Sequence, residues 1–151
     1  MTFDLAAITE IAIFFIVLGL AFAVFAAYIT QLGHAANSWP SVTARKLRDG
    51  IENSRTKSGE TYSAGYFMIY EYTVNGEKFT GSNISFSPKS PRERRYDGEK
   101  YKDAIEVTAY YNPKMPQISV LEPGINKRNF LMMFMGVAFV LIGTAFLVFD
   151  I

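Results

Sequence analysis

Two long apolar stretches enclose the charged part of this chain. The first covers residues 11–29, where the hydroxyl of Tyr28 is the only polar side-chain atom. The second covers residues 130–149, where Thr144 is the only strongly polar side chain. Because about 20 uncharged residues span roughly 30 Å of hydrocarbon as a helix, the sequence predicts two membrane-spanning helices with a water-exposed segment between them.

These stretches divide the chain into three parts. Residues 1–33 form an N-terminal tail and the first membrane helix, residues 34–129 a soluble β domain, and residues 130–151 the second membrane helix with a C-terminal tail. A cleaved signal peptide is the less favoured reading of the first stretch. The preceding residues carry no Lys or Arg, and the apolar run exceeds the usual 7–15 residues of a signal peptide.

The basic residues predict which side of the membrane the domain occupies. All fifteen Lys and Arg lie between the two apolar stretches, as do eleven of the fourteen acids, so this segment carries about +4. Bases close to membrane spans favour the cytoplasmic side. We therefore expect an integral protein of the bacterial inner membrane with a cytoplasmic domain and both termini outside. Segments longer than about 60 residues can nevertheless translocate despite their charge.

Small residues recur at helical spacings in both apolar stretches and predict a packing face. Such residues let helix backbones approach closely within lipid, so the two helices would pack on each other or on a partner. The alternative is that Ala and Gly are simply common in membrane helices. Neither stretch has an ionisable residue in its interior, which argues against a self-contained channel or transporter. The predicted packing residues are Gly19, Ala23, Ala26, Ala27, Gly136 and Gly143.

The segment between the helices has the pattern of a small, mostly antiparallel β domain. Residues 66–74 are rich in aromatic and branched side chains, and Asn75-Gly76 then predicts a type I′ hairpin turn. The returning strand, residues 77–86, changes phase, which predicts a bulge near Gly81. The fold class is thus a membrane α+β protein with a twisted sheet or partly closed barrel of OB or SH3 type. Further strands are expected at residues 42–51, 104–111 and 118–121.

Several short motifs follow one another along the chain. They are Trp39-Pro40, Tyr70-x-Tyr72-x-Val74-Asn75-Gly76, Phe79-x-Gly81, Val107, Tyr110-Tyr111-Asn112-Pro113, Pro116 and Leu121-Glu122-Pro123-Gly124. With a membrane helix on either side, the sequence resembles the bacterial "domain of unknown function 3592" family. The resemblance implies a membrane-anchored β domain and brings no catalytic residues with it.

Residues that could carry chemistry are few. The chain has no cysteine, which excludes a disulfide framework, a thiolate metal site and a cysteine nucleophile. His34 is the only histidine, and Asp49 with Glu52 forms a carboxylate pair without further ligands. Catalysis and metal binding need convergent partners. We therefore expect no enzymatic activity, no metal and no cofactor.

Residues 87–103 form a polar insert. Mixed-sign stretches that contain proline are usually solvated loops, and a loop is the expected structure. A second interpretation is that its bases, Lys89, Arg92, Arg94 and Arg95, contact anionic lipid headgroups. Nucleic acid is not an expected partner, because the positive excess of the domain is small.

Three functions fit this sequence. The leading one is a non-catalytic subunit or modulator of a larger membrane assembly, with lipids and a membrane protein, or a second copy, as partners. The others are an immunity-type protein that neutralises a membrane-targeting toxin and a lipid- or peptide-binding module.

The orientation can be tested with single cysteines, because the natural chain has none. We expect Ser58→Cys to react with a membrane-impermeant maleimide only after cell lysis, and Thr2→Cys, in the tail predicted to lie outside, to react in intact cells. Labelling of Ser58→Cys in intact cells would contradict the charge argument.

Overall fold

The computed structural model describes residues 5–55 and 61–149, so Ser58 lies outside the described residues. The chain forms two compact units. One combines Met1–Gln31 with Asn126–Ile151, and the other is Leu32–Ile125. These boundaries fall within a few residues of the predicted division.

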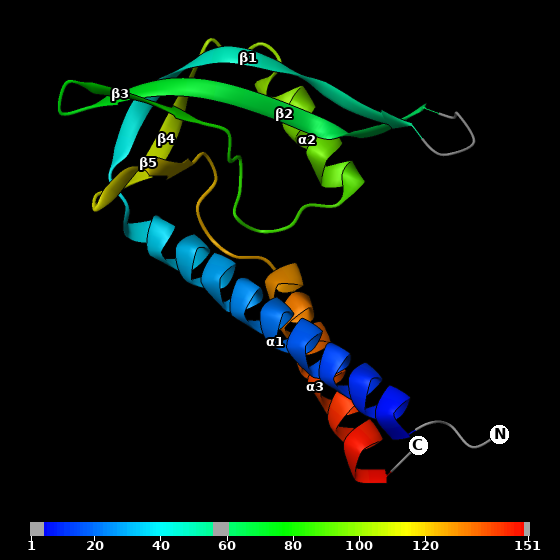
Figure 1. Cartoon of the computed structure of the whole chain (residues 1–151). Helices are drawn as coiled ribbons and strands as arrows, with labels where there is room; N and C mark the ends of the chain where they lie inside the picture. Colours follow the sequence, from blue (N-terminus) through cyan, green and yellow to red (C-terminus); the bar gives the residue numbers. More distant parts are fainter. Residues whose placement is uncertain (1–4, 56–60, 150–151) are drawn as a thin grey trace. The chain divides into compact units, whose positions relative to one another are not determined.

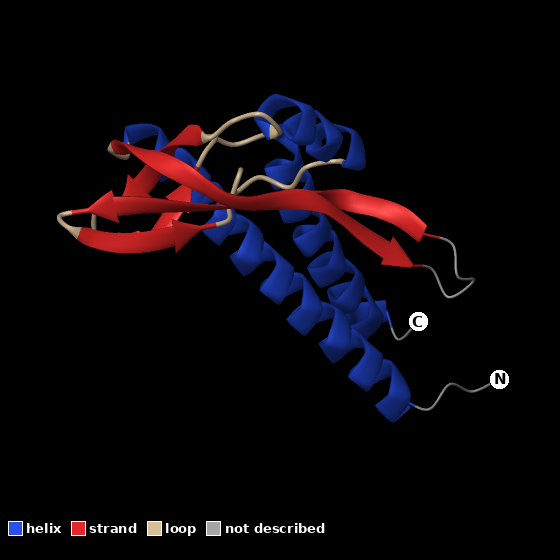
Figure 2. Cartoon of the chain, turned by 90° about the horizontal axis from the view of Figure 1, so that it is seen from above, coloured by secondary structure: helices blue, strands red, loops and turns tan. Residues whose placement is uncertain are grey.

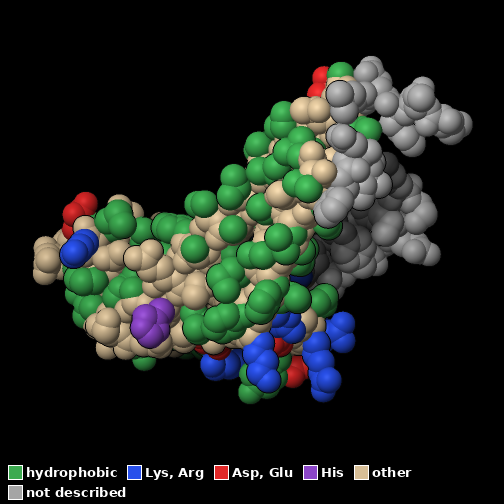
Figure 3. Space-filling view, turned by 90° about the horizontal axis from the view of Figure 1, so that it is seen from below, with side chains coloured by type: hydrophobic (Ala, Val, Ile, Leu, Met, Phe, Trp, Pro, Cys, Tyr) green, Lys and Arg blue, Asp and Glu red, His purple; other side chains and the backbone are tan. Residues whose placement is uncertain are grey.

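The first unit is a pair of helices, α1 (Leu5–Ala35) and α3 (Lys127–Phe149), which lie side by side in Figures 1 and 2. Both are long and apolar enough to cross a bilayer. Large apolar side chains such as Phe14, Val24 and Leu141 remain exposed on their surfaces, and hydrophobic side chains predominate on the face shown in Figure 3.

Small residues bring the two helix backbones together. A Cβ atom added at Gly19 would lie 2.6 Å from the carbonyl oxygen of Gly136, and one added at Gly143 would lie 2.7 Å from that of Ala12. A Cβ atom at Gly136 would lie 2.8 Å from the nitrogen of Ala23. The predicted stripe is therefore the contact between α1 and α3. Ala26 is also buried, whereas Ala27 is exposed.

Aromatic rings and one polar link fill the rest of this contact. The ring of Phe15 lies 5.9 Å from that of Phe139 and 6.2 Å from that of Phe146, measured between centroids. The buried Asn129 donates from Nδ2 to the hydroxyl of Thr30 at 3.3 Å. Such a hydrogen bond satisfies a polar group that would be costly in an apolar environment.

The second unit is a five-stranded antiparallel sheet with one helix. Its strand order is β3-β2-β1-β4-β5, and the helix α2 (Pro91–Tyr101) stands between β3 and β4 in the sequence. The amides of Leu121 and Glu122 donate to the carbonyls of Asn83 and Ile84 at 3.2 and 2.8 Å. These bonds join the segments that follow β5 and β3, so the sheet is nearly closed, as in an OB-type barrel. The strands are β1 (Ser41–Arg55), β2 (Thr61–Val74), β3 (Glu77–Gly81), β4 (Glu106–Asn112) and β5 (Met115–Val120).

Tyrosines of β2 form the core of this unit. Tyr70 and Tyr72 are almost fully buried, with ring centroids 6.1 Å apart. Their hydroxyls bond to Ser119 and to the carbonyl of Pro116, both in β5. Burial of a tyrosine requires such a partner for its hydroxyl. The other members of the core cluster are Ala44, Met68, Val74, Ile84, Tyr101, Ala109 and Leu121.

The predicted turn is confirmed, but the predicted bulge is wrong. Asn75 and Gly76 have positive φ angles of 51° and 84°, as a type I′ turn requires. β3 pairs with β2 without a shift and ends at Gly81. The glycine is explained by close packing, because an added Cβ atom there would meet Ser119 and the ring of Tyr70. Register shifts occur instead in the β1–β2 pairing, between Lys46 and Arg48 and between Glu52 and Asn53, and in the β4–β5 pairing, between Tyr111 and Asn112.

The polar insert is largely a helix, so the expected loop is wrong. α2 begins with a capping box, in which the Ser90 hydroxyl accepts from the Glu93 amide and the Glu93 carboxylate accepts from the Ser90 amide. Pro91 occupies the first turn, where it lacks only an amide that needs no partner. The proline and the mixed charges therefore mark the start of a helix rather than a loop.

Two strands extend well beyond the rest of the sheet. β1 pairs with β4 only from Ser41 to Arg45, and β2 pairs with β3 only from Tyr70 to Val74. Residues 46–55 and 61–69 therefore continue as a two-stranded ribbon, which Figures 1 and 2 show beside α2. We refer to these residues as the β1–β2 ribbon.

We expect Gly19→Leu to separate α1 from α3, because its side chain would meet the backbone of Gly136 and Val140. Val17→Leu, at a side chain that is 60% exposed, is the matched control. Overpacking of this kind costs about 2 kcal/mol. Thermal unfolding of the full chain in detergent, followed by circular dichroism, should show a lower midpoint for Gly19→Leu only. Equal midpoints for the two variants would refute the packing contact.

Candidate functional site

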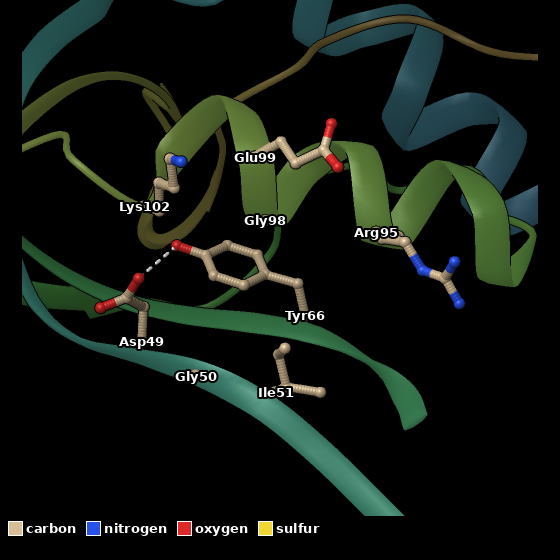
Figure 4. A pocket seen from close by; sticks show the side chains of 8 residues that line it. All are labelled: Asp49, Gly50, Ile51, Tyr66, Arg95, Gly98, Glu99 and Lys102. Atoms are coloured by element: carbon tan, nitrogen blue, oxygen red, sulfur yellow. Dashed lines mark hydrogen bonds between the residues drawn. The ribbon is translucent and has the colours of Figure 1, made fainter. Parts of the chain in front are cut away.

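A pocket of about 470 Å³ opens between the β1–β2 ribbon and α2. We call it the ribbon pocket, and Figure 4 shows its lining. β1 contributes three consecutive residues, β2 one, α2 three, and the segment that follows α2 one. The lining residues are Asp49, Gly50, Ile51, Tyr66, Arg95, Gly98, Glu99 and Lys102, the last just beyond the end of α2.

The pocket exists because α2 packs on β2 and leaves the β1 side of the ribbon uncovered. At Gly65, which has a φ of 138°, an added Cβ atom would meet the side chain of Arg94. At Gly98, an added Cβ atom would lie 3.2 Å from the ring of Tyr66. Two glycines thus allow the helix to approach β2 closely, while Ile51 on β1 stays 64% exposed.

Asp49 and Tyr66 bond to each other on the wall of the pocket. The Tyr66 hydroxyl donates to Asp49 Oδ2 at 2.7 Å, the bond drawn in Figure 4. This bond, helped by Lys46, lowers the pKa of Asp49. Burial and the neighbouring carboxylate raise the pKa of Tyr66. Asp49 is therefore an ionised acceptor that fixes the tyrosine ring in place.

Lys46 connects this pair to the end of α2. Its Nζ atom donates to Asp49 Oδ2 at 3.2 Å and to the carbonyl oxygens of Tyr101 and Lys102 at 3.1 and 2.7 Å. A cation at these carbonyls satisfies groups that a helix end leaves unpaired and complements the helix dipole. The ammonium group thereby sets the distance between β1 and the helix that forms the opposite wall.

A second set of ion pairs holds α2 to the segment after β5. Lys89 Nζ lies 2.7 Å from Asp97 and 2.6 Å from Glu122, and Lys100 Nζ lies 2.7 Å from Glu122. Tyr101 also donates its hydroxyl to Glu122, at 3.1 Å. Burial raises the pKa of Asp97 despite Lys89. For Glu122, burial acts in the same direction, but the bonds from Lys100 and Lys89 outweigh it and lower the pKa.

The structure places the sequence-predicted site residues in different settings. Lys89 is engaged in the internal ion pairs, whereas Arg92, Arg94 and Arg95 lie on the exposed surface of α2. Their contact with lipid headgroups stays a prediction. His34 is exposed near the end of α1, and Asp49 is bound to Tyr66 and Lys46. The side chain of Glu52 lies outside the described residues.

Sequence reasoning missed Ile51, Tyr66 and Gly98 as pocket residues. The alternation of β2 places Tyr66 on the same strand face as Tyr70 and Tyr72. No pattern indicated that the insert folds back as a helix over that tyrosine. Among the described residues, no group of three or more His, Asp or Glu side chains is arranged to hold a metal ion.

The match to a known family spans the whole of this sheet and pocket. Residues 41–126 match the family described as "Domain of unknown function (DUF3592)". The chain belongs to this family. A comparison with curated proteins finds no match. The matched residues run from the start of β1 to the segment before α3, so the pocket lies within the DUF3592 domain.

Replacement of Glu122 tests whether the ion pairs hold α2 in place. We expect Glu122→Gln to lower the free energy of unfolding by about 2 kcal/mol, because Lys100 loses its carboxylate partner and Lys89 loses one of its two. Glu99→Gln, on the exposed face of α2, should change it by less than about 0.5 kcal/mol. Denaturant unfolding of the full chain in detergent can be followed by fluorescence of Trp39, the only tryptophan, which packs on Phe86 within the domain.

The same pair of proteins gives a pH test. The folded-state pKa of Glu122 lies below its ordinary value of 4.5. Its ionised form therefore contributes stability above pH 4.5, and this contribution is lost as the pH falls through the folded-state pKa. The stability difference between wild type and Glu122→Gln should shrink over that range. A difference that is independent of pH would contradict the assignment.

Proposed function

We propose that this DUF3592 protein is a non-catalytic subunit or modulator of a bacterial inner-membrane assembly. In this proposal α1 and α3 cross the bilayer, both chain ends lie outside, and the β domain binds a protein partner in the cytoplasm. The single observation that carries the proposal is the ribbon pocket, an open cavity with a largely apolar wall in a domain attached to two apolar helices.

The chemistry of the pocket favours binding over catalysis. Asp49 and Tyr66 satisfy each other, and Lys46 bonds to a helix end. A general base needs a reachable proton and a pKa near the working pH, whereas Asp49 is held ionised with its pKa lowered. Concave apolar sites with a few polar groups are the usual form of binding sites.

The helix pair favours association within the membrane as well. Its glycines are used in the contact between α1 and α3, while bulky side chains such as Phe14, Phe134 and Leu147 face outward. These exposed surfaces are suited to lipid and to neighbouring membrane helices. Nucleic acid has no role in the proposal.

Site-specific photocrosslinking in intact cells tests the proposal. A photoreactive phenylalanine analogue is placed in turn at Ile51 on the pocket, at Thr80 on β3 and at Val17 on α1, all exposed positions. We expect at least one position to give a discrete product with a defined partner after irradiation. The absence of any discrete product at all three positions would refute a subunit role.

A complementation experiment separates binding from chemistry. We expect His34→Ala, which removes the only histidine, to restore the phenotype of a deletion strain when it accumulates to the wild-type level. Loss of function in this variant, with normal membrane insertion, would indicate an active site and contradict the non-catalytic proposal.

A further inference from the structure

The inner edge of the β1–β2 ribbon is open beside the ribbon pocket. β1 pairs with β4 as far as Arg45, and the amide of Lys46 donates to the carbonyl of Ile105 at 2.9 Å. β1 itself continues to Arg55. Among the described residues, no strand pairs with this edge of β1 beyond Lys46. Alternate amide and carbonyl groups of residues 47–51 therefore point away from β2 toward an unoccupied edge.

The pocket and the free edge belong to the same short stretch of β1. Asp49 and Ile51, two residues apart, place their side chains on the face that α2 only partly covers. In a strand, side chains two apart share a face. Tyr66, the partner of Ile51 in β2, forms the inner wall. A strand added along this edge would continue the line of β4 between β1 and α2.

We propose that the ribbon pocket and the free edge of β1 together form a groove that binds an extended acidic peptide by strand addition. The peptide's backbone pairs with residues 47–51, one apolar side chain enters the pocket, and acidic residues on either side of it meet Arg95 and Lys102. This inference rests on the proposed function and names the chemistry of the partner segment. Main-chain bonds of this kind supply affinity, and side-chain pockets supply specificity.

The charges around the groove select acidic flanks. Arg95 and Lys102 lie at the two ends of the α2 wall in Figure 4, seven residues apart and thus on one helix face. Glu99 points away from the strands in the same view. The negative charge of Asp49 is matched by Lys46 at 3.2 Å. The groove is therefore positive at both ends and apolar in the middle.

The open edge favours a peptide over an acyl chain. A lipid tail could fill the apolar cavity, but it offers no donor or acceptor to the backbone groups of β1. An extended peptide supplies both, at the spacing of the strand. Gly98 packs closely on the ring of Tyr66 and closes the β2 side of the cavity. An occupant therefore enters from the β1 side.

The binding experiment uses defined peptides and the full chain in lipid nanodiscs. The probe is the peptide Glu-Val-Leu-Val-Glu, with fluorescein on its N-terminus and an amide at its C-terminus. Its binding is measured by fluorescence anisotropy. The central Leu is replaced in turn by Ile, Phe, Met and Ser, and the two Glu by Lys. We expect binding with each apolar central residue, and at least tenfold weaker binding with central Ser or with flanking Lys.

Matched variants locate the binding. Ile51→Glu should weaken binding at least tenfold, whereas Met115→Glu, an equally polar change at an exposed residue of β5, should leave it unchanged. Arg95→Glu combined with Lys102→Glu should weaken binding of the acidic peptide and restore binding of the Lys-flanked one. Arg92→Glu, exposed on the same helix outside the pocket, should do neither. Unchanged Trp39 fluorescence confirms that each variant is folded.

Hydrogen exchange decides whether the edge takes part. Saturation with the Leu peptide should slow amide exchange within residues 47–51. The proposal would be overturned if binding survived Ile51→Glu, or if no peptide with an apolar central residue bound. It would also be overturned if monomeric laurate displaced the peptide and the peptide gave no slowing of amide exchange within residues 47–51. Photocrosslinks at Thr80 or Val17 with none at Ile51 would refute the groove while leaving the subunit role intact.

Discussion

The ammonium group of Lys46 is the interaction on which the arrangement of the β domain most depends. It stands at the last point where β1 still meets β4, and it bonds both to Asp49 on its own strand and to the carbonyl end of α2. Without a cation there, a helix end and a carboxylate would face each other across a partly buried space. Because Lys46 bonds to the carboxylate and to the helix-end carbonyls at once, it offsets their repulsion and connects the sheet to the helix. The ribbon pocket is the space that this link keeps open.

Charged side chains of the β domain also form internal ion pairs. The segment from residue 87 to residue 103 is the most polar in the sequence, yet several of its side chains are internal. Lys89 and Asp97 are largely buried, and Lys89 pairs both with Asp97 and with Glu122 in the segment after β5. A buried pair of this kind adds little net stability, but loss of one partner is costly because the other charge is left unpaired. These pairs determine which face of α2 turns toward the sheet, and so which residues remain to line the pocket.

Local chemistry made part of this structure predictable. The Asn75-Gly76 turn, the apolar helices and the Gly19, Gly136 and Gly143 contacts follow from short-range rules of backbone conformation and packing. The alternation of residues 66–74 likewise indicated a strand with one buried face. The first strand was expected over residues 42–51, and β1 in fact runs on to Arg55. Gly50 lies in the part of β1 that β4 does not reach, and the ring of Phe67 lies beside it, 3.2 Å from the position of an added Cβ atom.

The remainder of the site depended on contacts between distant residues. In the sequence, the proline and mixed charges of residues 87–103 indicated a loop, whereas the structure shows that this segment forms a helix with a capping box at Ser90. Its helical state is supported by Glu122, more than twenty residues further along the chain. The pocket then arises from the placement of that helix over Tyr66 rather than over β1. No sequence spacing encodes that choice, which depends on glycines at positions 65 and 98.

The chain enters and leaves the β domain at one point. The amide of Gly124 donates to the carbonyl of Gly33 at 3.0 Å. A side chain on Gly33 would collide with the carbonyl oxygen of Gly124, so the close approach requires a glycine at position 33. A domain whose two ends lie close together can be attached to a pair of neighbouring helices without a change in its own fold. Such a unit can be exchanged between host proteins, or lost from one, through two neighbouring breaks in the chain. Adjacent ends of this kind are the geometry that lets a domain be inserted within another chain, and the Gly33–Gly124 bond is where the two ends meet.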